Sequence, residues 1–359
     1  MAANDEASLF QTRNNTVRAK VYHLFPVSCI MNEERKNFKE ELIMDMELGM
    51  ELVLDTNLPL CECNNCFMGS FLQMMRYKGV RLSELEVQLP YAGVRLSLSY
   101  QEGISLSANF IQGIHYFCSE NQIAYKTGEI LPQHIGEVAY EILSEHGAFM
   151  ISLNSRDYGY YKAFVNDGIQ HCTLVTGVDR EGLHIVDVCA STSQPTTHKG
   201  VLPFGNILEI GQHQPIPIAY IEGEVAWDKK EKEIDWVQAR KNHMEENIKL
   251  EQGSRLRTGL DYCQYLYSDL PSLRGFELRK IAHNIMTDTH VPQLKMLINL
   301  FADKKQQEYY IKMNQLCNDW TLMSYRFLKG SFEYDFADQE TLVYNYKALL
   351  EREREIYQL

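Results

Sequence analysis

Between residues 147 and 221 the chain carries short apolar runs of β-strand length, whereas longer runs with helical spacing lie on both sides. Such runs, bounded by turn residues, are typical of strands. The strand candidates cover 147–153, 170–178, 183–188 and 216–221. Two of them are separated only by Asp179-Arg180-Glu181-Gly182, which predicts an antiparallel hairpin. Because helices come first and strands follow without alternation, the order predicts an α+β fold.

The rest of the chain divides into a tail, a region leading into the sheet and a helical end. Residues 1–19 form a polar tail, 20–225 one domain and 226–359 a helical domain, with the boundary after the last strand candidate. Residues 88–104 read as irregular. Other helices are expected near 33–54, 105–120, 132–145, 228–250, 254–267, 273–288, 291–304, 306–328 and 337–356.

Composition excludes several classes of protein. The net charge of −13 argues against general nucleic-acid binding and against attraction to an anionic membrane. No run approaches the ~20 apolar residues that span a bilayer. The acidic N-terminus lacks the apolar segment of a secretory signal, and the nine cysteines are scattered without a disulfide pattern. A cytoplasmic protein with reduced thiols is therefore expected.

The stretch around Cys66 reads as the start of a buried helix. Asn64 and Asn65 precede the cysteine as candidate caps, an apolar run follows, and Gly79 suits the position just after the helix. In the first turn, unpaired N–H groups and the helix dipole favour a thiolate. Cys66 is thus either a nucleophile or an inert buried cysteine, since free cysteines are commonly buried.

The hairpin provides the groups that would activate this thiol. His171 opens its first strand and Asp187 lies near the end of its second. A histidine can take the proton of a thiol, and a carboxylate can fix the tautomer of that histidine. A two-residue loop would place His171 and Asp187 on opposite faces of the sheet, because side chains alternate along a strand. A triad therefore predicts an odd-length loop, with Thr173 opposite Asp187.

These stretches resemble a known enzyme family. The order of Cys66, then His-x-x-x-x-x-Gly-x-Asp from His171, is similar to the papain-like fold of bacteriocin-processing peptidases. The segments Asn-Cys-Phe-Met-Gly-Ser at 65–70 and Arg-Tyr-Lys-Gly-Val-Arg-Leu-Ser-Glu at 76–84 resemble the acyltransferase family typified by the butirosin biosynthesis acyltransferase. The resemblance covers about residues 20–225, and a helical C-terminal region is also usual in that family.

The resemblance implies an activity, partners and residue roles. It implies a papain-like catalytic domain that takes an acyl group from the phosphopantetheine arm of an acyl or peptidyl carrier protein and transfers it to a small amine. Amide formation of this kind belongs to antibiotic and other natural-product biosynthesis. Cys66 would be the nucleophile, His171 the base and Asp187 the orienting acid, with no bound cofactor. A papain-like peptidase or amidase, in which water resolves the same intermediate, is the alternative.

One departure concerns the oxyanion hole. Papain-like proteases usually place a glutamine six residues before the cysteine, where this chain has Leu60. The backbone N–H of Cys66 remains a donor, and Asn64 or Asn65 is a candidate for a side-chain donor. An oxyanion donor contributes about 10²–10³ in rate. Its replacement favours a thioester substrate, which is more activated than a peptide.

Other features allow two interpretations each. The sequence Cys61-x-Cys63-x-x-Cys66 offers metal ligands, but no second pair completes a zinc signature, so no metal site is expected. The aromatic loop before His171 is either ordinary packing or the wall of a substrate cleft; it comprises Tyr158, Tyr160 and Tyr161.

Basic residues are candidates for docking an acidic carrier protein, because two bodies of like charge need a local patch of opposite sign. Arg76, Lys78 and Arg81 gather at the end of the Cys66 helix. Arg255 and Arg257 would lie in the first turn of the helix expected at 254–267, where positive charge is unfavourable to the helix itself. Either these arginines serve docking or they are ordinary solvated charges.

Overall fold

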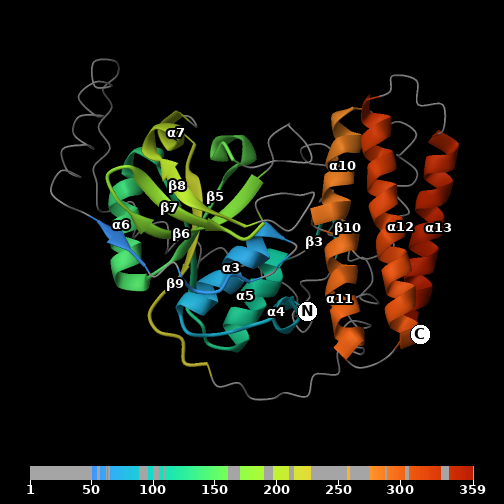
Figure 1. Ribbon diagram of the computed structural model, residues 1–359, viewed down its shortest axis with the longest axis horizontal. Helices are drawn as coiled ribbons and strands as arrows, with labels where there is room; N and C mark the ends of the chain where they lie inside the picture. Colours follow the sequence, from blue (N-terminus) through green and yellow to red (C-terminus); the bar gives the residue numbers. More distant parts are fainter. Residues whose placement is uncertain are drawn as a thin grey trace, which may run out of the picture. The chain divides into compact units, whose positions relative to one another are not determined.

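The fold was taken from a computed structural model (Figure 1). It describes residues 51–54, 57–61, 63, 65–88, 96–99, 105–108, 110–160, 170–189, 197–209, 214–227, 257–258, 275–287, 289–303, 307–332 and 339–358. By its contacts the chain divides into two compact units, residues 1–48 and 49–359, and every described residue belongs to the second. The domain boundary expected near residue 225 stays a prediction.

The centre of this unit is a seven-stranded antiparallel sheet with helices around it, so the protein is α+β as the sequence predicts. The strand order is β4-β9-β5-β6-β7-β8, and β1 pairs with β6 beyond the end of β5. The strands are β1 (Leu52–Val53), β4 (Tyr125–Ile130), β5 (Phe149–Asn154), β6 (Gln170–Val178), β7 (Gly182–Asp187), β8 (His198–Pro203) and β9 (Ile216–Ile221).

The four strand candidates from the sequence are the inner strands of this sheet. Three of its strands were missed: the two edges, and β1, where the helix expected near 33–54 is wrong at its end. Strands β5, β6, β7 and β9 lie close to the predicted runs. Strands β4 and β8 each pair on one side only and alternate between covered and exposed residues, so they lack a continuous apolar run. A second sheet joins β10 (Arg257–Thr258), β2 (Leu96–Ser99) and β3 (Ser105–Ala108).

The helix that starts at the nucleophile candidate is α3 (Cys66–Tyr77), and both of its ends are as predicted. Asn65 is the N-cap, and its side-chain oxygen accepts the N–H of Phe67 and of Met68 at 3.0 Å each. At the other end Gly79 has φ of 79°, and the N–H of Val80 reaches back to the carbonyl of Met75 at 2.9 Å. This is a Schellman motif, which requires the left-handed conformation that glycine adopts readily.

Helix α3 packs directly on the strands that carry His171 and Asp187. The Ser70 hydroxyl donates to the carbonyl of Cys172 in β6 at 3.2 Å. A Cβ atom on Gly69 would lie only 2.2 Å from Cγ2 of Val188, just after β7, so the close approach of helix and strand requires glycine here. The helix buries Met68, Phe71, Leu72, Met74 and Met75 in a hydrophobic core that it shares with the sheet. Cys66 is thereby fixed beside the sheet.

The remaining helices agree with the sequence in most places. They are α4 (Glu84–Gln88), α5 (Phe110–Glu120), α6 (Ile135–His146), α7 (Phe204–Glu209), α10 (Phe276–Thr287), α11 (His290–Asp303), α12 (Gln307–Phe332) and α13 (Gln339–Gln358). The last four pack around a separate core centred on Trp320. Among the described residues no helix is long and apolar enough to cross a membrane.

Three expectations about helices need correction or lie outside the described residues. The helix expected from 105 begins only at Phe110, because 105–108 forms β3. The helix expected at 254–267 is wrong in its first turn, where Arg257 belongs to β10 and pairs with Leu98. Pairing with a remote strand overrides the local helical pattern there. Arg255 and the helix expected near 228–250 lie outside the described residues.

Candidate active site

The β6–β7 hairpin brings His171 and Asp187 to one face by a route that the sequence analysis did not foresee. The last cross-strand pair is Val178 with Leu183, so the connection has an even number of residues and the expectation of an odd-length loop is wrong. A β-bulge between Val175 and Gly177 then shifts the register by one residue. Beyond it Leu174 pairs with Val186, which places Thr173 opposite Asp187 as the triad requires.

The bulge has a cause elsewhere in the chain. The backbone N–H of Leu54, just after β1, donates to the carbonyl of Thr176, the extra residue of the bulge, at 2.8 Å. Gly177 pairs with Val53, and a Cβ atom on this glycine would lie 2.9 Å from the carbonyl oxygen of Leu52. Strand β1 thus pairs with β6 next to the bulge that shifts the register of β6 against β7.

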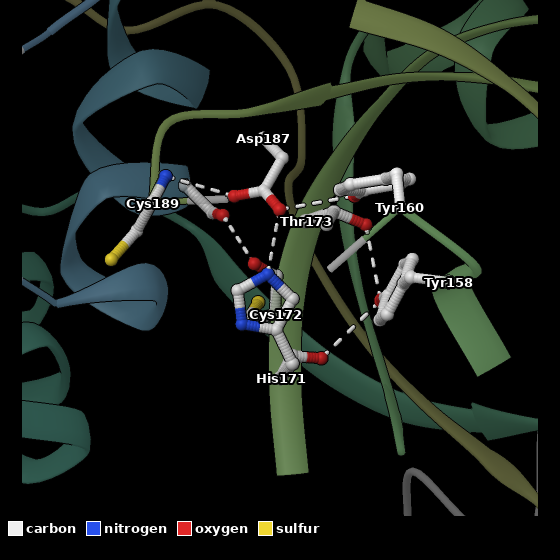
Figure 2. A network of polar contacts seen from close by, with 8 residues as sticks. Tyr158, Tyr160, His171, Cys172, Thr173, Asp187 and Cys189 are labelled. Carbon is white, nitrogen blue, oxygen red and sulfur yellow. Dashed lines mark hydrogen bonds and ion pairs between the residues drawn. The ribbon is translucent and has the colours of Figure 1, made fainter. Parts of the chain in front are cut away.

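His171 and Asp187 form a buried pair (Figure 2). Nε2 of His171 lies 2.7 Å from Oδ2 of Asp187, and both side chains are fully buried. The same Oδ2 accepts the hydroxyl of Tyr160 at 3.0 Å, and Oδ1 accepts the backbone N–H of Cys189 at 2.8 Å. With three donors around it the buried carboxylate is well satisfied, and it holds the ring of His171 in one orientation.

Two of the three aromatic residues singled out in the sequence support this pair. Tyr158 is buried, and its ring meets the His171 ring edge-on with centroids 5.3 Å apart. Its hydroxyl donates to the His171 carbonyl at 3.3 Å and accepts from Thr173 at 3.2 Å. Tyr160 stacks on His198 and bonds to Asp187. The role of cleft wall stays a prediction for both, and Tyr161 lies outside the described residues.

Cys66 completes the arrangement from the helix side. Its charge acts on His171, and because Nε2 of that ring is bonded to Asp187, Nδ1 is the ring nitrogen left for the thiol. Burial lowers the pKa of His171, but the negative charge of Cys66 and the hydrogen bond and charge of Asp187 outweigh burial and raise this pKa to about 10. The ring therefore keeps its proton at neutral pH beside the sulfur.

This raised pKa predicts a pH-dependent contribution to stability. The ordinary histidine pKa of 6.5 applies to the unfolded chain, whereas the folded value is about 10. Between these values the folded state binds a proton that the unfolded state releases. The contribution of His171 is therefore complete below pH 6.5 and is lost as the pH rises through about 10.

The measurement is urea unfolding of the wild type and of His171→Gln across this pH window. The free energy of unfolding of the wild type should fall more steeply with rising pH than that of the variant. Equal slopes would show that the ring does not hold the proton in the folded state.

The other cysteines near α3 differ from Cys66 in environment. Of the seven described cysteines, Cys66 alone is partly exposed and the others are buried. Burial raises the pKa of Cys61 to about 11, and it also raises the pKa of Cys63 and of Cys172, so all three remain thiols at neutral pH. Within the described part of the chain, no group of three or more His, Cys, Asp or Glu residues is arranged to hold a metal ion.

Of the two oxyanion candidates from the sequence, the structure describes Asn65. Asn64 lies outside the described residues. The oxygen of Asn65 caps α3, and one N–H of its Nδ2 donates to the carbonyl of Thr287 in α10 at 3.2 Å. Asn65 is a structural cap that ties α3 to α10. The backbone N–H of Cys66 stays outside this capping pattern.

Some residues of the site were not singled out in the sequence. Cys189 contributes only its backbone N–H, which any residue at that position could supply. His283 in α10 is affected by the charge of His171, although it lies more than a hundred residues further along the chain. In the sequence His283 lies on an otherwise apolar helix face, and this pattern does not distinguish it from a histidine that is buried for packing alone.

Comparison with models of protein families finds no match for this chain, and comparison with curated proteins finds none either.

Proposed function

We propose that the protein is a cysteine acyltransferase that accepts an acyl group from a carrier-protein thioester on Cys66 and transfers it to an amine. One observation carries the proposal: the helix that begins at Cys66 packs on the strand of His171, and Nε2 of this histidine lies 2.7 Å from the buried Asp187. Nucleophile, base and orienting group in this order are the parts of an activated thiol.

The proposed reaction has two halves. The sulfur of Cys66 attacks the carbonyl carbon of the thioester, a new C–S bond forms, and the C–S bond to the phosphopantetheine arm breaks. The departing thiolate takes the proton held by His171. In the second half an amine attacks the acyl group on Cys66, His171 accepts a proton from the amine, and Cys66 leaves as an amide forms. No redox step or bound cofactor is needed.

We further propose that the domain expected at residues 20–225 is papain-like. A helix that starts at the nucleophile and packs on antiparallel strands carrying the histidine and the aspartate supports this fold. The resemblance of 65–70 and 76–84 to the acyltransferase family typified by the butirosin biosynthesis acyltransferase supports the choice of transfer over hydrolysis. The carrier protein, the amine acceptor and a place in natural-product biosynthesis rest on that resemblance alone.

The basic residues at the end of α3 are partly accounted for by the fold. Nη1 of Arg76 donates to the carbonyl of Pro59 at 2.7 Å, and the ammonium group of Lys78 donates to the carbonyl of Gly223 at 2.5 Å. Both cations tie loops to the helix end, so docking a carrier is not needed to explain them.

The experiment that tests the choice of acceptor is product analysis after one turnover. The purified protein is mixed with an acyl-loaded carrier protein or an acyl-pantetheine thioester, with and without a panel of amines. An acyltransferase is expected to yield amide in proportion to the amine and little free acid. Free acid as the main product at saturating amine would instead favour the peptidase or amidase alternative.

A further inference from the structure

Helix α10 brings a second buried histidine to the Cys66 end of α3. Asn65, which caps α3, donates its Nδ2 to the carbonyl of Thr287 at 3.2 Å. His283 lies one turn before Thr287 on the same side of α10, and the Thr287 hydroxyl donates to the His283 carbonyl at 3.0 Å. The charge of His171 also acts on His283. The contact of α10 with the Asn65 cap and the charge effect together bring His283 within electrostatic range of the proposed triad.

His283 is a buried histidine with an unused hydrogen-bonding atom among the described residues. The residue is only 5% exposed, and its Nδ1 has no hydrogen-bond partner among the residues that the structure describes. A buried polar atom without a partner costs about 1–3 kcal/mol, so such atoms often serve a functional purpose. Burial and then the charge of His171 lower the pKa of His283 to about 4. Its ring is thus neutral at neutral pH.

The proposed reaction needs a second oxyanion donor, because the side chains of the triad do not supply one. When Cys66 attacks a thioester, negative charge develops on the carbonyl oxygen, and donors aimed at that oxygen stabilise the transition state. The Cys66 N–H is one donor. Leu60 has no polar side chain, and the Asn65 amide is bonded to the carbonyl of Thr287. A second donor at the start of α3 is therefore missing from the triad itself.

We propose that the ring of His283 is the second donor of the oxyanion hole, acting together with the backbone N–H of Cys66. This inference rests on the proposed acyltransferase function. A neutral imidazole suits the task, because it polarises a carbonyl without placing a second positive charge beside His171. In this arrangement α10 contributes a catalytic residue, and the C-terminal helices complete the site.

The test compares two reactions of the same thiol in His283→Ala. Acylation of Cys66 by an acyl-pantetheine thioester passes through an oxyanion, whereas alkylation by iodoacetamide does not. The variant should acylate about 10²–10³-fold more slowly than the wild type and alkylate at an unchanged rate. His283→Gln, which keeps a side-chain N–H donor, should recover part of the acylation rate. Thr287→Val, which removes a buried hydroxyl from the same helix, should leave both rates near those of the wild type.

Each outcome distinguishes the inference from its alternatives. Equal acylation by His283→Ala and the wild type would overturn the inference while leaving the acyltransferase proposal standing. Equal losses in acylation and alkylation would show that His283 only supports the fold around Cys66, and this too would overturn it. Absence of acylation in the wild type would instead contradict the proposed function.

Discussion

Cys66→Ala is expected to abolish acyl transfer, with a loss on the order of 10⁶-fold, as for removal of the nucleophile from a serine protease. Cys66 lies in the first turn of α3, which packs on the strand of His171, and it is the partly exposed cysteine among those described. Without the sulfur no acyl-enzyme can form, whatever the remaining residues do. Steady-state rates with an acyl-pantetheine thioester and an amine measure the loss.

The matched controls are the two cysteines that precede α3. Cys61 and Cys63 are buried, and Cys61 donates its thiol to the carbonyl of Gly69 at 3.2 Å. Cys61→Ala and Cys63→Ala should retain most of the activity, with at most a modest loss of stability. If either variant proved as inactive as Cys66→Ala and bound metal were found by elemental analysis of the wild type, the cluster of cysteines would be a metal site instead.

Asp187→Asn is expected to lower turnover by about 10³–10⁴-fold without unfolding the protein. The backbone N–H of Cys189 and the hydroxyl of Tyr160 both donate to Asp187. An asparagine oxygen facing Cys189 would turn its NH₂ group toward Nε2 of His171. That nitrogen would then have to accept, the ring proton would move to Nδ1, and the ring could no longer take the proton of Cys66.

The same hairpin offers a control with the same chemical change. Asp179 Oδ2 lies 2.6 Å from Nε2 of His184, so it forms a second aspartate–histidine pair outside the proposed site. Asp179→Asn should leave turnover nearly unchanged. Asp187→Asn should still react with iodoacetamide at high pH, where the thiol ionises without help. A small effect of Asp187→Asn on turnover would remove Asp187 from the mechanism.

The sequence predicted the features of the site that depend on neighbouring residues. The Asn65 cap, the place of Cys66 in the first turn and the Gly79 terminus are local patterns with local causes, and all three are confirmed. The inner strands were also predictable, because they are continuous apolar runs. Edge strands such as β4 were missed, because exposure on one side breaks the run.

Features that depend on remote pairing could not be predicted in the same way. The register between His171 and Asp187 is set by a bulge at Thr176, where β1 joins the sheet from more than a hundred residues earlier. A prediction from loop length alone therefore gave the right register for the wrong reason. The approach of α10, which carries His283, to the start of α3 likewise depends on the contact between Thr287 and Asn65, which no local pattern indicates.

The most direct test of the account is intact-mass analysis of the protein quenched shortly after mixing with an acyl-pantetheine thioester, followed by mapping of the modified peptide. The account predicts one acyl adduct, located on Cys66, that disappears when an amine is added and is replaced by free amide. No adduct on the wild type, or an adduct that forms equally on Cys66→Ala, would contradict the claim that Cys66 is an acyl-accepting nucleophile.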